Sequence, residues 1–219
     1  CDDHAAVRAI PGVLARLAAG EVVALVSDAG TPLVSDPGYA VVKAVIEAGL
    51  PVFPLPGASS LLAALTGAGL PSDRVLFAGF LPAKSGGRRT ALEGLKTPGQ
   101  TVVVFESGPR LAASLADMAE VLGPREAVVA RELTKLHETW VRGPLDQLAV
   151  DPRCQAPKGE MVVVIGPADE VAPDEATLDQ ALTAELADRS VSEAAARVAA
   201  SLGLPRKQVY RRALELSGQ

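Results

Sequence analysis

The fold of this chain is decided by the stretch Val22-Val23-Ala24-Leu25-Val26-Ser27-Asp28-Ala29-Gly30-Thr31-Pro32-Leu33-Val34-Ser35-Asp36-Pro37-Gly38. Residues 22–26 form an unbroken apolar run, which is typical of a strand covered on both faces. A loop rich in glycine and proline follows, and residues 39–48 then show a helical pattern that ends at Gly49. This order indicates an α/β fold, in which the loop lies at the carboxyl end of a strand, where such folds bind ligands.

The same alternation continues along the chain. Strand-like runs cover 101–105 and 161–165, and a shorter one covers 51–53. Because runs of this kind occur in parallel strands covered by helices, we expect a parallel sheet. The other helical patterns cover 11–19, 59–68, 109–122, 178–187, 191–202 and 205–216.

Composition narrows the class of protein. The 219 residues are 48% hydrophobic and carry a net charge of -5, which suits one sizeable core or two small ones. Two cysteines cannot form a disulfide framework and suit a reducing cytosol. No apolar run reaches the roughly 20 residues that cross a bilayer, so we do not expect a membrane span.

The charge changes sign near the end of the chain. Residues 167–188 carry seven acids and no base, whereas residues 189–219 carry six bases and two acids. We therefore predict an acidic linker over 167–174 and a separate helical module over 175–219 that resembles a helix-turn-helix and assists docking on nucleic acid.

Two loops are candidates for ligand binding. In residues 27–38, Asp28 can accept hydrogen bonds from a ligand, or Asp28 and Asp36 can close turns and cap helices. In residues 54–60, Ser59 or Ser60 is an N-cap of the following helix, or the exposed N–H groups of that helix end bind a polar ligand group.

Two further segments are rich in charge. Residues 79–89 place Lys84, Arg88 and Arg89 in a loop without acids, which is either a solvated surface or a grip for phosphates. The dense charge of residues 129–139 is explained by surface ion pairing or by a role in the functional site. We interpret His137 as a structural or surface residue and not as a ligand. With two histidines and no Cys-x-x-Cys motif, we expect no metal site.

Taken together, these segments resemble the tetrapyrrole methylase family, in particular the branch that methylates small-subunit ribosomal RNA. The resemblance covers roughly residues 10–216. It rests on seven motifs in the expected order, namely residues 27–38, 54–60, 69–73, 77–82, 105–111, 130–138 and 158–160.

The resemblance implies two α/β domains, over residues 1–79 and 80–166, with S-adenosylmethionine in the cleft between them. It implies 2′-O-methylation of a cytidine ribose in 16S ribosomal RNA by a cytoplasmic enzyme, with a homodimer as a family precedent. The implied cofactor residues are Asp28, Ala29, Gly30, Ser59, Ser60, Phe105, Glu106, Leu133 and Gly159. The implied RNA-binding residues are Lys84, Arg88, Arg89 and Arg110.

The general base stays open among Glu106, Glu132 and Lys135, because nothing in the sequence ranks them. Two other functions remain as alternatives: a carbon methyltransferase acting on a tetrapyrrole, and a nucleic-acid-binding regulator that acts through residues 191–216. Family members that resemble this chain begin with an additional strand and glycine-bearing loop. We therefore expect a segment before Cys1, and expect the chain alone to bind the cofactor poorly and to self-associate.

Overall fold

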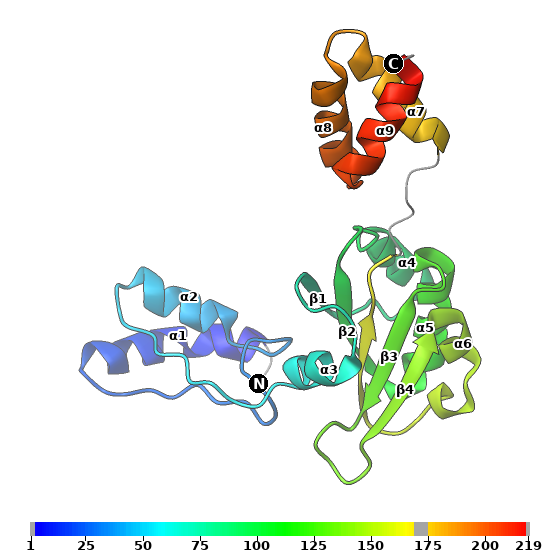
Figure 1. Ribbon diagram of the computed structural model, residues 1–219. Helices are drawn as coiled ribbons and strands as arrows, with labels where there is room; N and C mark the ends of the chain where they lie inside the picture. Colours follow the sequence, from blue (N-terminus) through cyan, green and yellow to red (C-terminus); the bar gives the residue numbers. More distant parts are fainter. Residues whose placement is uncertain (1–2, 169–174, 218–219) are drawn as a thin grey trace. The chain divides into compact units, whose positions relative to one another are not determined.

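The computed structural model describes residues 3–168 and 175–217 (Figure 1). The chain divides into two compact units, Cys1–Asp169 and Glu170–Gln219, and each is described by itself. The body, our name for the first unit, contains α1 (Asp3–Ala18), α2 (Tyr39–Glu47), α3 (Ser60–Ala68), β1 (Val75–Phe80), α4 (Ser85–Glu93), β2 (Thr101–Ser107), α5 (Gly108–Leu122), β3 (Glu126–Arg131), β4 (Thr139–Pro144), α6 (Leu145–Val150), the 3-10 helix η1 (Pro152–Cys154) and β5 (Glu160–Ile165).

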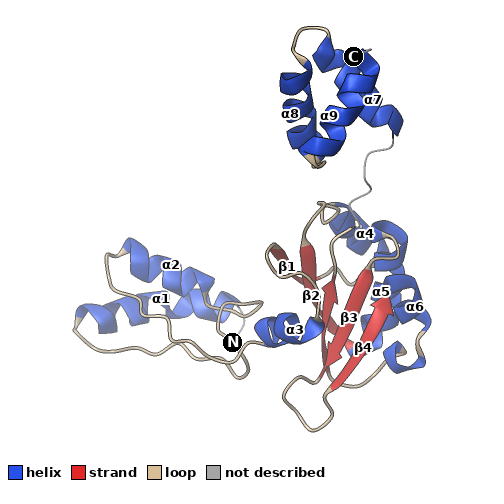
Figure 2. Cartoon of the chain, in the orientation of Figure 1, coloured by secondary structure: helices blue, strands red, loops and turns tan. Residues whose placement is uncertain are grey.

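One five-stranded sheet organises the body, with the strand order β1-β2-β5-β3-β4 (Figure 2). Only β1 and β2 pair in parallel within it, while β2 with β5, β5 with β3, and β3 with β4 are antiparallel. The prediction of a parallel sheet is therefore wrong. An unbroken apolar run reports burial of both faces of a strand, and it carries no information about the direction of the neighbouring strand.

Burial on both faces is confirmed for β2 and β5. Alternate residues of these strands point to opposite sides of the sheet. Val102 and Val104 pack with residues of α5 and α6, whereas Val103 packs with Ala64 and Ala68 of α3. The sheet thus has one face beneath α5 and α6 and another beneath α3.

The strands predicted over 22–26 and 51–53 are not formed, although helices α1 and α2 on either side of the first segment pack against each other. Val22 is 93% exposed and Phe53 is 81% exposed. Both segments have the side chains of buried strands, but no strand among the described residues pairs with them, and most of their side chains are exposed. Apolar sequence alone cannot form a ladder, because the backbone groups need partners.

Helix ends were predicted with mixed success. Ser59 is the N-cap of α3, where its side chain accepts from the N–H of Leu62, as the capping interpretation predicts. Helix α1 begins at Asp3, not at Pro11, and Pro11 lies inside it. Proline removes one internal hydrogen bond, and the exposed surface around Pro11 lets water satisfy the free carbonyl.

The second unit is a bundle of three helices, α7 (Glu175–Leu186), α8 (Val191–Leu202) and α9 (Arg206–Ser217), as predicted. Their buried faces form one small core that includes Leu182, Val198 and Val209. The short connection between α8 and α9 begins at Gly203, whose φ of 67° is favourable for glycine. With this module and the mixed body, the predicted α/β class is confirmed. Within the described residues, no helix is both long and apolar enough to cross a membrane.

Candidate active site

The two ligand-binding loops lie next to each other. The hydroxyl of Thr31 donates a 2.9 Å hydrogen bond to the carbonyl of Ala58. Gly30 has a φ of 72°, and a Cβ built on it would lie 4.0 Å from the same carbonyl oxygen. Thr31, which sequence reasoning missed, therefore joins residues 27–38 to residues 54–60. Its only signal was its place beside Gly30.

The first loop leaves Asp28 available to a ligand. The side chain of Ser27 closes the turn by donating to the carbonyl of Ala29 at 2.9 Å. Asp28 is exposed, and among the described contacts of the body its carboxylate has no hydrogen-bond or ion-pair partner. Gly38 is the N-cap of α2, so the capping alternative for Asp28 and Asp36 is not what the structure shows.

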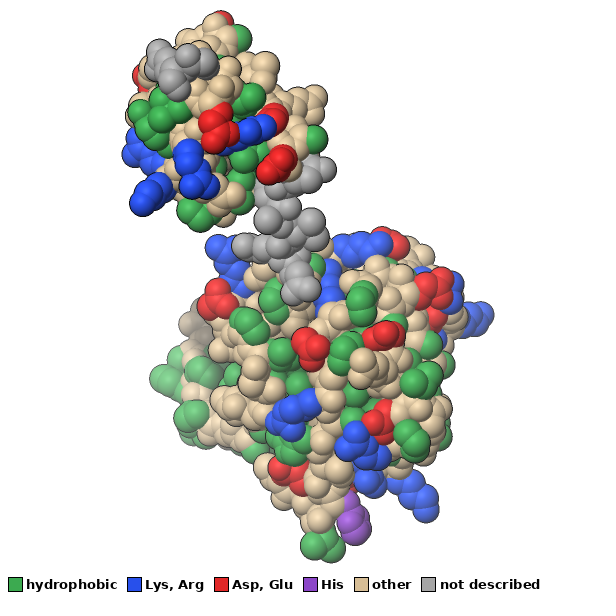
Figure 3. All heavy atoms as spheres, turned by 45° about the vertical axis from the view of Figure 1, so that its right-hand side comes forward, with side chains coloured by type: hydrophobic (Ala, Val, Ile, Leu, Met, Phe, Trp, Pro, Cys, Tyr) green, Lys and Arg blue, Asp and Glu red, His purple; other side chains and the backbone are tan. Residues whose placement is uncertain are grey.

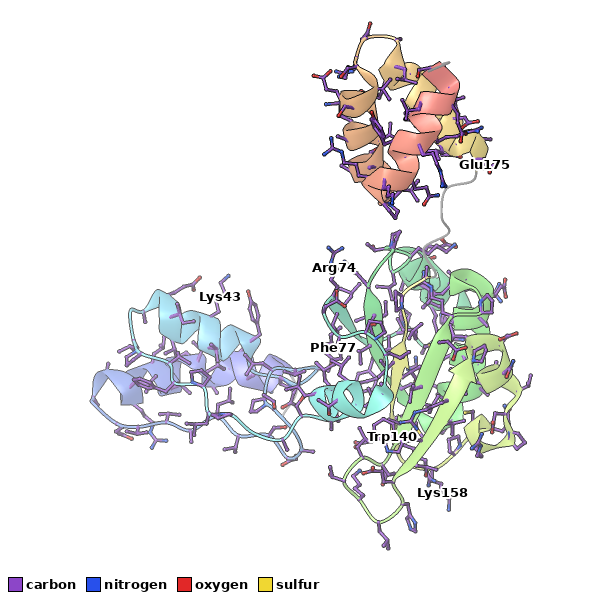
Figure 4. All side chains as sticks on the ribbon, in the orientation of Figure 1. Lys43, Arg74, Phe77, Trp140, Lys158 and Glu175 are labelled. Carbon is purple, nitrogen blue, oxygen red and sulfur yellow. The ribbon has the colours of Figure 1, made fainter. Side chains whose placement is uncertain are left out.

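The first loop also reaches β1. A Cβ on Gly79 would lie a tight 3.0 Å from the hydroxyl oxygen of Ser35, and Gly79 has a φ of 63°, so both its backbone conformation and this close approach favour glycine. Beside Gly79, the ring of Phe80 packs edge-on against Phe105 with centroids 5.6 Å apart. Phe105 and Leu133 pack in the same cluster as the buried residues of α3. Figure 4 shows Phe77, another member of this cluster, beside α3.

The predicted cofactor residues therefore fall into connected groups. Asp28, Ala29 and Gly30 adjoin the loop that starts α3, and α3 packs on the face of the sheet that carries Phe105 and Leu133. Since Ser59 and Ser60 stand at the start of α3, the loops and this face of the sheet are linked through one helix.

Glu106 does not belong to that face. It follows Phe105 on β2, so its side chain points to the opposite side of the sheet, beneath α5. Glu106 is 1% exposed and accepts hydrogen bonds from the N–H of Ser107 at 2.8 Å and the hydroxyl of Ser114 at 2.5 Å. Its assignment to the cofactor wall is wrong in this structure, and its burial leaves no access for a substrate proton.

Arg110 is occupied by the protein itself. Its Nη2 donates to the carbonyl of Leu81 at 2.7 Å and to that of Pro82 at 3.3 Å, while its Nε lies 3.2 Å from a Glu106 oxygen. The pair therefore ties the segment after β1 to α5, an arrangement that we call the Glu106–Arg110 brace. These contacts give Arg110 a structural role.

The basic segment after β1 is not a flexible loop, because residues 85–93 form α4. Arg88 is 3% exposed and pairs with Asp117 of α5, which also accepts a 2.8 Å hydrogen bond from Arg89. Burial by itself would raise the pKa of Asp117, but hydrogen bonds from Arg89, Ser85 and Arg88 outweigh it and lower that pKa. The RNA-contact prediction is therefore wrong for Arg88, whose charge is used inside the fold.

Lys84 and Arg89 differ from Arg88 in exposure. Lys84 is the N-cap residue of α4 and is exposed. The Arg89 side chain is 44% exposed, although Asp117 and Glu120 both pair with it. Sequence reasoning missed these partners because Asp117 lies 28 residues from Arg89 along the chain. Lys84 thus remains available, because no carboxylate pairs with it among the described residues.

Glu132 and Lys135 form a small ionic cluster with Glu160. Glu132 accepts from the N–H of Glu160 at 2.9 Å and from the Lys135 ammonium group at 3.1 Å, and these bonds lower the pKa of its carboxyl. Hydrogen bonds from Lys135 to Glu132 and Glu160 raise the pKa of Lys135. A lysine held in its protonated form cannot accept a proton, so Glu132 is the better candidate base.

Gly159 fits against this cluster. Its φ is 101°, and a Cβ at this position would overlap the carboxylate group of Glu132. Glycine is therefore required for packing as well as for backbone conformation. The surface-pairing interpretation of residues 129–139 is supported, because Glu138 also accepts from the indole of Trp140 at 2.9 Å. His137 is exposed.

No group of three or more potential ligands among His, Cys, Asp and Glu could hold a metal ion in the part of the chain that the structure describes.

Comparison with known proteins identifies the relatives of this chain. Residues 2–149 match the family model for tetrapyrrole (corrin/porphyrin) methylases, and residues 172–217 match the model for the RsmI C-terminal HTH domain. Ribosomal RNA small subunit methyltransferase I of Mesorhizobium japonicum is 49% identical over 98% of this chain and 74% of that protein. The protein of the same name from Escherichia coli O157:H7 is 43% identical over 99% of this chain and 77% of its own length.

Among solved structures, the methyltransferase CobJ shares the fold with a TM-score of 0.56. The match covers 77% of this chain and 74% of that one at 20% sequence identity. At this identity the likeness supports the fold alone.

Proposed function

The chain belongs to the tetrapyrrole (corrin/porphyrin) methylase family, and we propose that it methylates the 2′-oxygen of a cytidine ribose in small-subunit ribosomal RNA. S-Adenosylmethionine is the methyl donor. The observation that carries the proposal is the 49% identity, over nearly the whole chain, to a protein named for small-subunit ribosomal RNA methylation. We also propose that it acts in the cytoplasm, where its substrate is made, and as a homodimer.

The residues of the two loops fit the cofactor. Asp28 offers an exposed carboxylate that has no partner in the described part of the chain, which suits the hydroxyl or ammonium groups of the donor. Because Gly30 has no side chain, the space between its backbone and the carbonyl of Ala58 is free for a ligand. The N-terminus of α3 adds backbone N–H groups at Ser60 and Leu61. We propose that these residues and Ala29 bind the cofactor, with Ser59 fixing the helix end.

For methyl transfer, the protein must orient the ribose 2′-oxygen toward the methyl group and remove the hydroxyl proton. When bound, the cofactor supplies a methyl carbon attached to a positively charged sulfur. The ribose 2′-oxygen forms a bond to that carbon as the carbon–sulfur bond breaks, and the hydroxyl proton passes to a base. Glu132 is our candidate for that base among Glu106, Glu132 and Lys135, because Glu106 is buried and the ammonium group of Lys135 is held by two carboxylates.

Lys135 then acts as a positioning residue. Its two ion pairs, to Glu132 and Glu160, fix the orientation of the Glu132 carboxylate. Lys84 is the proposed phosphate contact of the body, because it is exposed at the start of α4. Phe105, Leu133 and Gly159 shape the site from the sheet side.

The test combines cofactor binding with methyl transfer. We expect the purified chain to bind S-adenosylmethionine weakly in a calorimetric titration, in keeping with the expectation from its sequence, and to transfer labelled methyl groups at a measurable rate to small-subunit RNA or subunits from a strain lacking this activity. Gly30→Val should reduce cofactor affinity at least tenfold, because valine at a φ of 72° is strained and its side chain enters the space beside Ala58. Gly12→Val is the control, because Gly12 has no neighbour within 4 Å.

Unchanged cofactor affinity in folded Gly30→Val protein would remove the first loop from the site. Transfer to a tetrapyrrole but not to ribosomal RNA would instead favour carbon methylation. RNA binding without any methyl transfer would favour the non-enzymatic alternative.

A further inference from the structure

The helical module carries cations that its own acids do not neutralise. Arg189 and Arg197 both pair with Glu185, at 2.8 and 2.9 Å. Arg212 pairs with Asp179 at 2.6 Å, which ties α9 to α7. These three arginines are therefore used within the module.

Three other basic residues lie on the first two turns of α9. Arg206, Lys207 and Arg211 are exposed, and no carboxylate pairs with them among the described residues. Within the described part of the chain, the side-chain hydrogen bond of this group runs from Arg206 to the neutral hydroxyl of Ser192 at 3.2 Å. Figure 3 shows Lys and Arg side chains gathered on one side of the module.

Spacing places these residues on one face. Arg206 and Tyr210 are four residues apart, as are Lys207 and Arg211, and residues four apart are neighbours on a helix surface. The opposite face contains Val209 and is buried in the module core. We call the exposed group Arg206, Lys207, Tyr210 and Arg211 the α9 face.

The charge of the α9 face does not stabilise its own helix. Positive side chains in the first turn of a helix oppose the helix dipole and so destabilise the helix. Arg206 and Lys207 occupy that turn. Because these positive charges destabilise the helix that carries them, we infer that they serve to bind an anionic partner.

We propose that the α9 face docks on the phosphate backbone of the ribosomal RNA substrate, and that Arg212 serves only to hold α9 in place. The partner follows from charge complementarity: a row of unpaired cations with one exposed aromatic ring matches RNA phosphates and an unstacked base. The short connection from α8 to α9 is also the geometry in which a second helix presents its first turns to nucleic acid. This inference rests on the proposed function, because that function supplies the RNA.

The test measures binding of small-subunit ribosomal RNA, transcribed in vitro, by the full chain across a range of salt concentrations. The variant is Lys207→Gln/Arg211→Gln. The control is Arg189→Gln/Arg197→Gln, which removes the same charge from the same module but takes it from cations already paired with Glu185.

Each phosphate contact contributes about 0.7–0.9 to the slope of log affinity against log salt. We therefore expect the variant to lose about 1.4–1.8 of slope and, at about 0.1 M salt, roughly 25- to 60-fold in affinity, with wild-type and variant converging toward 1 M. The control should lose less than about threefold. Cofactor affinity should stay unchanged in both proteins.

An equal loss of slope in variant and control, or no loss in either, would overturn the proposal. Tighter binding of a DNA duplex than of the RNA would overturn RNA as the partner. Methylation by wild-type and variant with the same dependence on RNA concentration would overturn the docking role alone. Slope loss in the variant, with no methylation by the wild-type chain, would uphold the α9 face and overturn the proposed function instead.

Discussion

Replacing Glu106 by glutamine separates a structural role from a catalytic one. The structure places Glu106 beneath α5, where it accepts from Ser107 and Ser114 and faces Arg110 at 3.2 Å. Glutamine keeps the shape of the side chain. Its oxygen can still accept from Ser107, and its amide group can donate to the Ser114 hydroxyl, which rotates to accept. The change therefore removes the charge opposite Arg110 and little else.

The magnitude follows from the exposure of the two partners. Breaking a fully buried ion pair costs about 3–5 kcal/mol. Glu106 is 1% exposed, but the Arg110 side chain is 31% exposed and water screens part of its charge. We expect Glu106→Gln to lower the free energy of unfolding of the body by about 1–3 kcal/mol, and Glu106→Ala by about 2 kcal/mol more because it leaves two buried donors without an acceptor.

Trp140 makes the body observable by itself, because it is the single tryptophan of the chain and lies in β4. Its fluorescence during denaturant unfolding gives the stability of the body without the helical module. In parallel, kcat and KM are measured over a range of pH. If Glu106 acts through the Glu106–Arg110 brace, Glu106→Gln shifts the unfolding midpoint and leaves the pH profile of kcat unchanged in the folded protein.

The opposite pattern would refute this reasoning. A Glu106→Gln protein that unfolds at the wild-type midpoint, but loses kcat by about a hundredfold and no longer shows the acidic limb of its pH profile, would identify Glu106 as the general base. Ser114→Ala provides the second check, because it disturbs the same carboxylate without removing its charge. It should lower stability by about 1–3 kcal/mol and leave the pH profile intact.

Two further predictions concern acid stability and thiol reactivity. The lowered pKa of Asp117 means that its ionised form stabilises the fold above the pKa of the unfolded chain and that this contribution is lost as the pH falls through the lower, folded value. The Asp117→Asn protein should therefore be less stable than wild type at neutral pH, and it should lose less stability than wild type as the pH falls below about 4. Denaturant unfolding at each pH measures both free energies, and parallel curves of unfolding free energy against pH would contradict the prediction. Burial, together with the nearby Asp151 carboxylate, raises the pKa of the Cys154 thiol to about 11. Iodoacetamide at about pH 8 should therefore label Cys154, as read from peptide maps, only under unfolding conditions. Rapid labelling of the native protein would contradict this prediction, because it would show that the buried thiol becomes accessible.

The predictable parts of the fold are those with local causes. Residues 191–202 are bounded by Ser190 and Gly203, and the structure forms the capping box between Ser190 and Glu193. The N-cap of α3 at Ser59 has the same kind of local signal. The β-branched runs of β2 and β5 also have a direct meaning, because only a strand with both faces covered buries every residue.

The parts that sequence reasoning missed depend on distant partners. The direction of a neighbouring strand leaves no mark on the residues of β2, and the runs at 22–26 and 51–53 look like strands but have no pairing partner in this structure. The basic residues after β1 show the same limit. Arg88 became an internal ion pair because Asp117, 29 residues later, faces it from α5. Charge in a sequence window does not reveal such a partner.

The candidate site depends on such a distant contact as well, through α3. The start of this helix carries Ser59, and its small residues Ala64 and Ala68 are buried against the sheet. Since the carbonyl of Ala58 accepts from Thr31, a movement of α3 against the sheet would also move the first loop.

The other end of α3 is fixed by Trp140 and Arg142. A side chain on Gly67 would overlap the indole ring of Trp140, and Arg142 donates a 2.6 Å hydrogen bond to the Gly67 carbonyl. The guanidinium group of Arg142 also lies 5.0 Å from the centre of the Trp140 ring. The edge strand β4 therefore sets the position of α3, and through α3 it sets the spacing of the loops proposed to bind the cofactor. For this reason the motifs at 27–38 and 54–60 define the chemistry of the site, while residues more than 70 positions away define its geometry.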